Sequence, residues 1–243
     1  MTIKHLTKHI KGASIISLMF FAVLGCDQPP ESKHYDITCY AAAYGGGIYK
    51  TVNGGLSWFP LSLDQRDFHH YFKGLYLHPQ NKQELYISTS GAGLFKLDLE
   101  KESLEPSGPF HQSRISALAF TDVSKTRYDL LLGLNAEGVY GRSFREKSWL
   151  PLNFGLSFRE VHVLFHVGRT AFAGTAKDLF RWDEDSQQWM STSHGIQNKN
   201  IFSIGTGPGD KTLFAGSGPF YKKNRFFQKI PCLYKSHDEG MTW

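Results

Sequence analysis

The stretch "GGGIYKTVNGGLSW", residues 45–58, decides the fold because the chain repeats it. Residues 232–243, "CLYKSHDEGMTW", follow the same template: Ser or Thr, any residue, Asn or Asp, any residue, Gly, any residue, Ser or Thr, Trp. Three weaker copies between them end at Leu104, Trp149 and Trp189, so the repeats end 46, 45, 40 and 54 residues apart. A recurring period of this length predicts a repeat architecture.

Each copy is preceded by short runs typical of β-strands. Runs rich in small and apolar residues come directly before the copies, as in "TAFAGTA" at 170–176 and "TLFAGSG" at 212–218. Four of these runs follow a further apolar stretch, which begins at Phe72, Ile115, Val161 or Ile201. Four short strands in 40–50 residues is the period of a β-propeller blade, and the small residues would let neighbouring sheets approach. The sequence therefore predicts an all-β chain with about five four-stranded antiparallel blades.

The first and last copies predict an incomplete ring. The first copy lacks an inner strand, and the chain ends on Trp243, where the last edge strand would begin. Propellers usually close by completing one blade with strands from both termini. We therefore expect a fragment of a larger propeller, with about six to eight blades in the full ring.

The N-terminus has the layout of a secretory leader. Residues 1–25 combine Lys4, Lys8 and Lys11 with an uncharged apolar run, Ala13–Gly25, that is too short to span a bilayer. The run ends in "VLGC", which resembles the lipobox of bacterial lipoproteins. That resemblance implies cleavage before Cys26 and acylation, palmitate included, of that residue. An ordinary secretory signal or a membrane anchor ending near residue 25 is the alternative.

Three segments follow from this leader: the signal peptide 1–25, a polar Pro-containing tether 26–36, and the propeller 37–243. Asp27 resembles the inner-membrane retention signal of enterobacterial lipoproteins, which would place the domain on the periplasmic face of that membrane. Without the leader, 24 of the 27 basic residues and all 22 acidic residues remain, and the net charge falls from +5 to +2. That excess is too small to predict nucleic-acid binding.

The two full copies of the template resemble Asp boxes, the BNR repeat element of sialidases and many other propellers. In this resemblance the motif caps the hairpin between the third and fourth strands of a blade, away from the substrate face. Short Asn or Asp side chains accept hydrogen bonds from backbone amides of the turn, and Gly adopts the positive φ that the turn requires. The Ser and Thr hydroxyls bond to further backbone groups, and the Trp ring covers the blade. We therefore assign a structural role to Thr51, Asn53, Gly55, Ser57, Trp58, Ser236, Asp238, Gly240, Thr242 and Trp243.

The resemblance extends over residues 37–243 and is nearest to the sortilin-like and photosystem-assembly-factor-like propellers, which are not enzymes and bind peptides or assembling partners. Sialidases are more distant, because the residues before Thr51 contain no arginine. A glycoside hydrolase would need two carboxylates across a cleft. Asp64, Asp67, Asp122 and Asp210 are candidates, but no spacing marks a pair, and solvated loop acids are the simpler interpretation.

The eleven histidines do not form a recognisable metal motif. His69 and His70 would point to opposite sides of a strand, and His162 and His166 would lie about 13 Å apart. We predict no metal, no cofactor and no catalytic residue.

One insertion has the composition of a recognition loop. Residues 219–231 combine basic and aromatic residues: Lys222, Lys223, Arg225, Phe226 and Phe227. Such a loop could bind an acidic or carbohydrate partner, although a decorated surface hairpin is the simpler interpretation. Cys39 and Cys232 are either a disulfide, if the ring closes, or two buried thiols.

These features together predict an exported lipoprotein, held at a membrane by its lipid, whose propeller is a non-catalytic binding or assembly module. Its ligand would be a protein, a peptide or a glycan. The alternative is a glycoside hydrolase of the same architecture with catalytic loops that are missing or unrecognised.

Overall fold

The computed structural model describes residues 37–43, 46–61, 63, 71–207, 212–222, 225–227 and 232–243. The expected leader, the tether and Cys26 lie outside these residues. Within them the chain is built from β-strands, and it contains no helix with the length and apolar character that a bilayer crossing requires.

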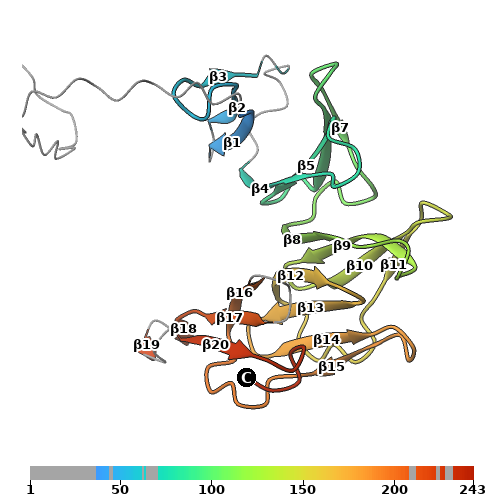
Figure 1. Ribbon diagram of the computed structural model, residues 1–243, viewed down its shortest axis with the longest axis vertical. Helices are drawn as coiled ribbons and strands as arrows, with labels where there is room; N and C mark the ends of the chain where they lie inside the picture. The colour runs from blue at the N-terminus through green and yellow to red at the C-terminus, as the bar shows by residue number, and fades with distance from the viewer. Residues whose placement is uncertain are drawn as a thin grey trace, which may run out of the picture. The chain divides into compact units, whose positions relative to one another are not determined.

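The described strands form five successive antiparallel sheets and one separate hairpin (Figure 1). The first sheet has three strands, β1 (Cys39–Ala43), β2 (Gly47–Thr51) and β3 (Phe59–Pro60). The second is made of β4 (Phe72–Leu77), β5 (Glu84–Thr89), β6 (Leu94–Asp98) and β7 (Ser103–Pro106). The third is made of β8 (Ile115–Phe120), β9 (Tyr128–Leu134), β10 (Gly138–Ser143) and β11 (Trp149–Pro151).

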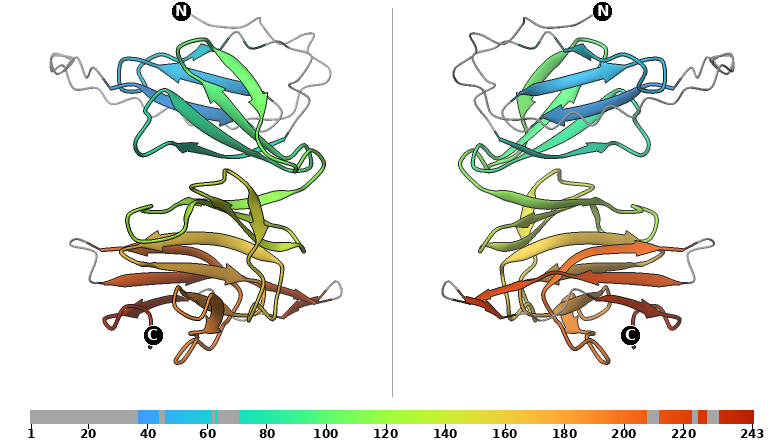
Figure 2. Two further views of the ribbon diagram at one scale, coloured as in Figure 1. Left: turned by 90° about the vertical axis from the view of Figure 1, so that its right-hand side faces the viewer. Right: turned by 90° about the vertical axis from the view of Figure 1, so that its left-hand side faces the viewer.

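The fourth sheet repeats the same order with β12 (Val161–Val167), β13 (Thr170–Thr175), β14 (Leu179–Asp183) and β15 (Gln188–Ser191). The fifth has three strands, β16 (Ile201–Thr206), β17 (Leu213–Ser217) and β20 (Leu233–Ser236). The hairpin of β18 (Phe220–Lys222) and β19 (Arg225–Phe227) lies between β17 and β20 in the chain. Because strands pair in chain order within each sheet (Figure 2), we call the sheets blades one to five.

The strands follow the predicted runs closely. The inner strands of blades two to five begin at the four expected residues, Phe72, Ile115, Val161 and Ile201. The second strand of a blade is covered on both faces by neighbouring sheets, so all seven residues of β9 are buried. This is why these runs are continuously apolar or small instead of alternating.

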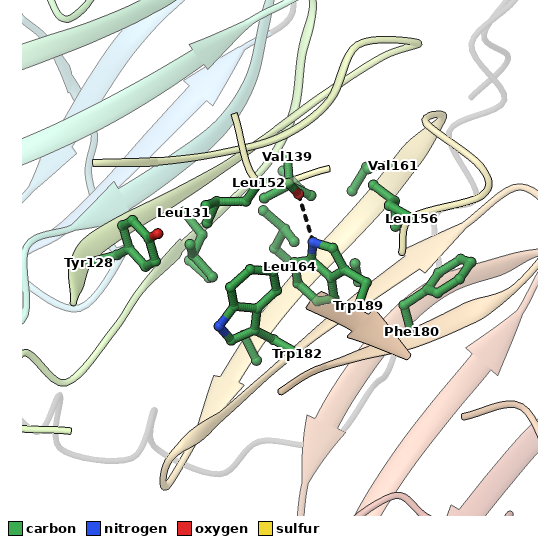
Figure 3. Packing of buried hydrophobic residues seen from close by; sticks show 14 residues of the cluster. Tyr128, Leu131, Val139, Leu152, Leu156, Val161, Leu164, Phe180, Trp182 and Trp189 are labelled. Atoms are coloured by element: carbon green, nitrogen blue, oxygen red, sulfur yellow. Dashed lines mark hydrogen bonds between the residues drawn. The ribbon is translucent and has the colours of Figure 1, made fainter. Parts of the chain in front are cut away.

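Four apolar clusters hold the blades together, one at each boundary between consecutive blades. The cluster between blades three and four contains Tyr128 and Leu131 from one blade and Trp182 and Trp189 from the next (Figure 3). The two indole rings meet edge to face with centroids 5.2 Å apart. Each blade is therefore stabilised by its neighbours, as expected for a repeat protein.

Glycines in the second strands allow the close approach predicted from the sequence. A Cβ atom on Gly133 of β9 would lie 2.8 Å from Cγ1 of Val161 in the next blade. A Cβ atom on Gly174 of β13 would lie 2.7 Å from Cγ2 of Ile201. Larger residues at these positions would push the inner strand of the following blade away.

The closing aromatic residue of a blade rests on a glycine turn of the blade before it. Trp189 donates its backbone N–H to Phe154 O at 2.9 Å and its indole N–H to Leu152 O at 2.8 Å. A Cβ atom on the adjacent Gly155 would lie 2.1 Å from Trp189 O. Trp243 repeats this contact on the His194–Gly195 turn, with its N–H 3.0 Å from His194 O.

Trp58 differs from the other closing aromatic residues. It is 42% exposed, whereas Trp189 is 2% exposed. The first blade has no earlier blade in the described chain whose glycine turn could receive it. Trp58 is therefore left more open than Trp189, and its indole ring lies against Gly55 of its own turn, where a Cβ atom would come 3.8 Å from Cζ2.

The cysteine interpretations are also corrected. Cys39 at the start of β1 is partly buried and Cys232 is exposed just before β20. The two do not form a disulfide with each other in this structure. The alternative of two buried apolar thiols is wrong as well, because Cys232 lies at the surface at the foot of the hairpin.

Candidate functional site

The turn between β2 and β3 contains the first full copy of the motif and is held by its own side chains. Thr51 Oγ1 donates to Asn53 Oδ1 at 2.8 Å and accepts the N–H of Gly55 at 3.0 Å. Asn53 Oδ1 also accepts the N–H of Ser57 at 3.0 Å, and Asn53 Nδ2 donates to Ser57 Oγ at 2.8 Å. Gly55 has a φ of 96°. The side chains of Thr51, Asn53 and Ser57 are therefore engaged within the turn.

The second full copy, after β20, has the same network. Ser236 Oγ donates to Asp238 Oδ1 at 2.7 Å and accepts the N–H of Gly240 at 2.9 Å, while Asp238 accepts the N–H and the hydroxyl of Thr242 at 2.9 and 2.6 Å. Gly240 has a φ of 81°. These hydrogen bonds, led by the one from the Thr242 hydroxyl, hold the pKa of Asp238 well below its usual range.

The three eroded copies form a different hairpin. In each, one residue other than glycine has positive φ two positions before the closing residue: Glu102, Lys147 and Gln187. In blades two and four an aspartate at the start of the hairpin, Asp98 or Asp183, accepts amide protons of the following turn. The blades therefore tolerate two turn designs.

The carboxylate of Asp238 predicts acid sensitivity of the last turn. Its pKa is depressed in the folded chain, so its contribution to stability is complete above the unfolded value of about 3.9 and is lost as the pH falls below it. Asp238→Asn, which copies Asn53 of the first turn, should remove this dependence. We expect the melting temperature of the wild type to fall more steeply than that of the variant between about pH 4 and pH 2. Parallel curves in calorimetry would contradict this assignment.

A structural feature that the sequence does not mark is a bulge at the same place in four inner strands. The pairing with the second strand shifts between Phe72 and Gly74, Ile115 and Ala117, Val161 and Val163, and Ile201 and Ser203. The extra residues are Lys73, Ser116, His162 and Phe202, which we call the bulge residues. Bulges re-aim side chains and are enriched near functional sites.

The bulge residues lie at the end of the blades opposite to the motif turns. Inner strands begin where second strands end, and the turns between the third and fourth strands lie at the other end of the same antiparallel sheets. One backbone hydrogen bond recurs at this end in blades two to five. The carbonyl of the residue before each inner strand accepts an N–H from the turn after the second strand, and in blade four Ala176 N–H donates to Glu160 O at 3.1 Å. This contact holds the start of each inner strand in place.

His162 and Phe202 form the centre of the bulged end. Their rings stack in parallel with centroids 4.3 Å apart and an interplanar angle of 7°. Burial lowers the pKa of His162, and the Lys73 ammonium acts in the same direction, while Glu160 and Asn200 oppose the shift. The imidazole is therefore neutral at neutral pH. Phe202 is 50% exposed and offers an aromatic surface to solvent.

The polar surroundings of this stack are mainly basic. Lys73, Arg114 and Arg159 are exposed at or next to the starts of inner strands, and Glu160 is the carboxylate directly before β12. Glu137 and Asp178 lie in the turns after β9 and β13 at the same end, where Asp178 is paired with Lys199 at 3.6 Å. Asn200 is 6% exposed, and its Oδ1 atom is buried beside His162 without a hydrogen-bond donor. The bulged end is therefore a basic and aromatic surface in the described part of the chain.

The candidate carboxylates do not gather at this end. Asp122 lies in the turn after β8, at the end of the blades that carries the motif turns, where Lys125 and Ser124 hold its pKa well below its usual range. Asp64, Asp67 and Asp210 lie outside the described residues. The hydrogen bonds of Asp122 to Ser124 and its ion pair with Lys125 show that this carboxylate holds the turn after β8.

The structure describes two of the four histidines considered above and part of the insertion. His162 and His166 are both half-buried, and burial lowers the pKa of each. Within the described residues no group of three His, Cys, Asp or Glu side chains could hold a metal ion. His69, His70 and Lys223 lie outside the described residues. The insertion forms the short hairpin of β18 and β19, in which Lys222 pairs with Arg225 and Tyr221 with Phe226, while Phe227 pairs with Phe220.

No sequence signal in one copy could have identified the bulged end. The four bulge residues are a lysine, a serine, a histidine and a phenylalanine, so they share no residue type. What they share is position, directly after the first buried residue of each inner strand. Aligning the copies on that residue, instead of on the closing Trp, would have brought them into one column.

Comparisons with solved structures support the fold. An ancestral GH74 enzyme matches with a TM-score of 0.65 and 16% identity, over 85% of this chain and 29% of that enzyme. The extracellular domain of a hybrid two-component system from B. thetaiotaomicron matches with a TM-score of 0.55 and 11% identity, over 73% and 26% of the two chains. The WD40 repeats of RRP9 match with a TM-score of 0.57 and 14% identity, over 74% and 53%.

These similarities show the fold alone, and they confirm that the chain is a partial β-propeller. No protein-family model and no curated protein sequence matches it. The chain spans 29% of the length of the GH74 enzyme and 26% of that of the two-component sensor domain.

Proposed function

We propose that this chain is an exported bacterial lipoprotein whose β-propeller is a non-catalytic binding or assembly module at the cell envelope. The leader and "VLGC" support export and lipidation at Cys26. Two motif turns with the same side-chain network support the resemblance to Asp-box propellers. Under the Asp27 rule the domain would lie on the periplasmic face of the inner membrane.

The bulged end is the observation that carries the binding proposal. Its centre is the exposed face of Phe202 stacked on a neutral His162, with Lys73 close enough to affect the imidazole. Aromatic faces with nearby cations suit the recognition of ligands, whereas glycoside hydrolysis needs two facing carboxylates. Glu160 is the described carboxylate that acts on His162, while Asp178, in the turn after β13 at the same end, is paired with Lys199 at 3.6 Å.

The alternative is a glycoside hydrolase, and it draws on the similarity to the GH74 enzyme. At 16% identity this similarity carries the fold and not the activity. A hydrolase would require a second acid at the bulged end that faces Glu160 across a cleft. The two proposals differ in whether the chain releases reducing ends from a polysaccharide.

Site-specific photo-crosslinking in bacteria that carry the gene tests the proposal. A photoreactive phenylalanine at position 202 should give discrete adducts with a macromolecule of the envelope fraction. The same residue at position 190 is the control, because Met190 is 52% exposed on an outer strand away from the bulges. Cys26→Ala should abolish palmitate labelling and membrane retention in the same cells. Adducts of equal yield from both positions, or none from 202, would argue against a binding module.

A parallel hydrolysis assay tests the alternative. Purified chain is incubated with a panel of soluble polysaccharides that includes xyloglucan, and the release of reducing ends is measured. We expect no release above the background of a heat-denatured sample. If the chain released reducing ends and the Glu160→Gln variant did not, the hydrolase proposal would be supported and the binding proposal rejected.

A further inference from the structure

A cavity lies between blades two and three, at the end of the blades that carries the motif turns. Its volume is 380 Å³, which is within the range of small-molecule sites. Both blades supply its walls, from the turn after β4, from β5 and β6, and from β9 and β10 with the turn that follows. It therefore depends on the packing of two blades and is separate from the bulged end.

Three rings form an aromatic wall of this cavity. Phe120 meets His78 and Tyr86 edge to face, with centroids 5.0 and 5.6 Å apart. His78 Nδ1 accepts hydrogen bonds from the backbone N–H groups of Gln80 and Asn81 at 3.2 and 3.0 Å, which fix the ring against the turn after β4. The rings therefore form a surface suited to an apolar or aromatic body.

An ion triad lies against these rings, with Arg142 over the Tyr86 ring at 5.7 Å from its centroid. Asp129, which is 9% exposed, accepts two hydrogen bonds from Arg142 at 2.8 and 3.2 Å and one from Lys147 at 3.0 Å. Burial raises the pKa of Asp129, but the hydrogen bonds from Arg142 and Lys147 outweigh it, so the carboxylate is ionised. Arg142 also donates to Tyr86 OH at 3.1 Å across the blade boundary. The triad thus has one positive charge in excess.

The remaining charges do not cancel this excess. Lys96 and Glu84 also line the cavity and balance each other formally. Three cations therefore face two carboxylates around a preformed space. Lys147 is the exposed member, with 59% of its side chain accessible, so its ammonium can reorient toward an incoming anion.

We propose that this cavity binds a small organic monoanion with an aromatic or apolar body. The carboxylate, or an equivalent anionic group, would lie near Lys147 and Arg142, and the body would pack against Phe120 and His78. An orienting charge beside an apolar ring surface gives the two parts of a small-molecule site. This inference does not rest on the function proposed for the bulged end, and either can fail without the other.

Phenylacetate is the test ligand, and phenylacetamide is its neutral control of the same shape. Binding to the full chain in a mild detergent is measured by isothermal titration calorimetry. We expect saturation with a dissociation constant of about 1 mM for a ligand of this size. The amide should bind at least about tenfold more weakly, because it cannot use the excess positive charge.

Lys147→Asn removes the mobile charge without new backbone strain, since Lys147 has a φ of 56° and Asn tolerates positive φ. We expect about fivefold weaker binding of phenylacetate by this variant. Lys101→Asn is the matched control, because Lys101 is an exposed lysine in the equivalent turn of blade two and does not line the cavity. Equal affinities for acid and amide, equal effects of the two variants, or no saturation by phenylacetate would each overturn the proposal.

Discussion

Gly155→Ala is expected to lower the free energy of unfolding by about 3 kcal/mol. Two effects add at this position. Gly155 has a φ of 79°, which an alanine adopts only with strain, and the new Cβ would lie 2.1 Å from Trp189 O. The backbone of the closing residue would have to move, and its hydrogen bond to Phe154 O would be lost with it. Urea unfolding followed by circular dichroism measures the change.

Gly168→Ala separates the two effects. Gly168 has a φ of 60° in the turn between β12 and β13, but a Cβ there would meet nothing within 4 Å. This variant should therefore lose about 1 kcal/mol, which is the cost of the backbone conformation alone. If both variants lost the same amount, the contact between Gly155 and Trp189 would have no energetic role, and our account of how blades are joined would be wrong.

Trp189→Ala is expected to cost about 4 kcal/mol, the largest effect of a single side chain that we predict. Trp189 is 2% exposed, packs edge to face on Trp182, and hydrogen-bonds to the preceding blade through both its backbone and its indole (Figure 3). Its removal would leave a cavity at the boundary of two blades and an unpaired carbonyl at Leu152. The loss should appear as a lower urea midpoint by circular dichroism.

Trp58→Ala is the matched control, because Trp58 closes the first copy of the same repeat but is 42% exposed. We expect a cost below about 1 kcal/mol, since most of its surface contributes no packing. A loss as large as that of Trp189→Ala would mean that Trp58 is buried in solution. The glycine turn that it lacks in the described chain would then have to be supplied by something else.

The two predictions share one physical basis. The repeat unit seen in the sequence, which ends at a Trp, is not the unit of stability, because each closing residue completes its contacts on the blade before it. Trp243 shows the same dependence through His194 O and Gly195. Stability is therefore expected to be distributed over blade boundaries, as in other repeat proteins.

Much of the fold could be read from the residues because it depends on local chemistry. The strand starts at Phe72, Ile115, Val161 and Ile201 follow from apolar runs, and the motif turns follow from short polar side chains next to glycine. The sequence also shows a glycine six residues after Trp149 and another six residues after Trp189. The residue that each of these glycines contacts, however, lies in the next repeat. Only the structure joins Gly155 to Trp189.

The two sites could not be predicted, since neither is made by residues close in sequence. The bulge residues have four different side chains, and only the shifted pairing of inner strands brings His162 onto Phe202 from the next blade. The ion triad needs Asp129 and Arg142 on paired strands and Tyr86 across a blade boundary. The sequence by itself therefore determined the repeat, its strands and its turns, which rest on contacts within a few residues. The tertiary structure decided how the blades pack together and which side chains meet, because those contacts span 13 residues or more or depend on a bulge that no residue type marks.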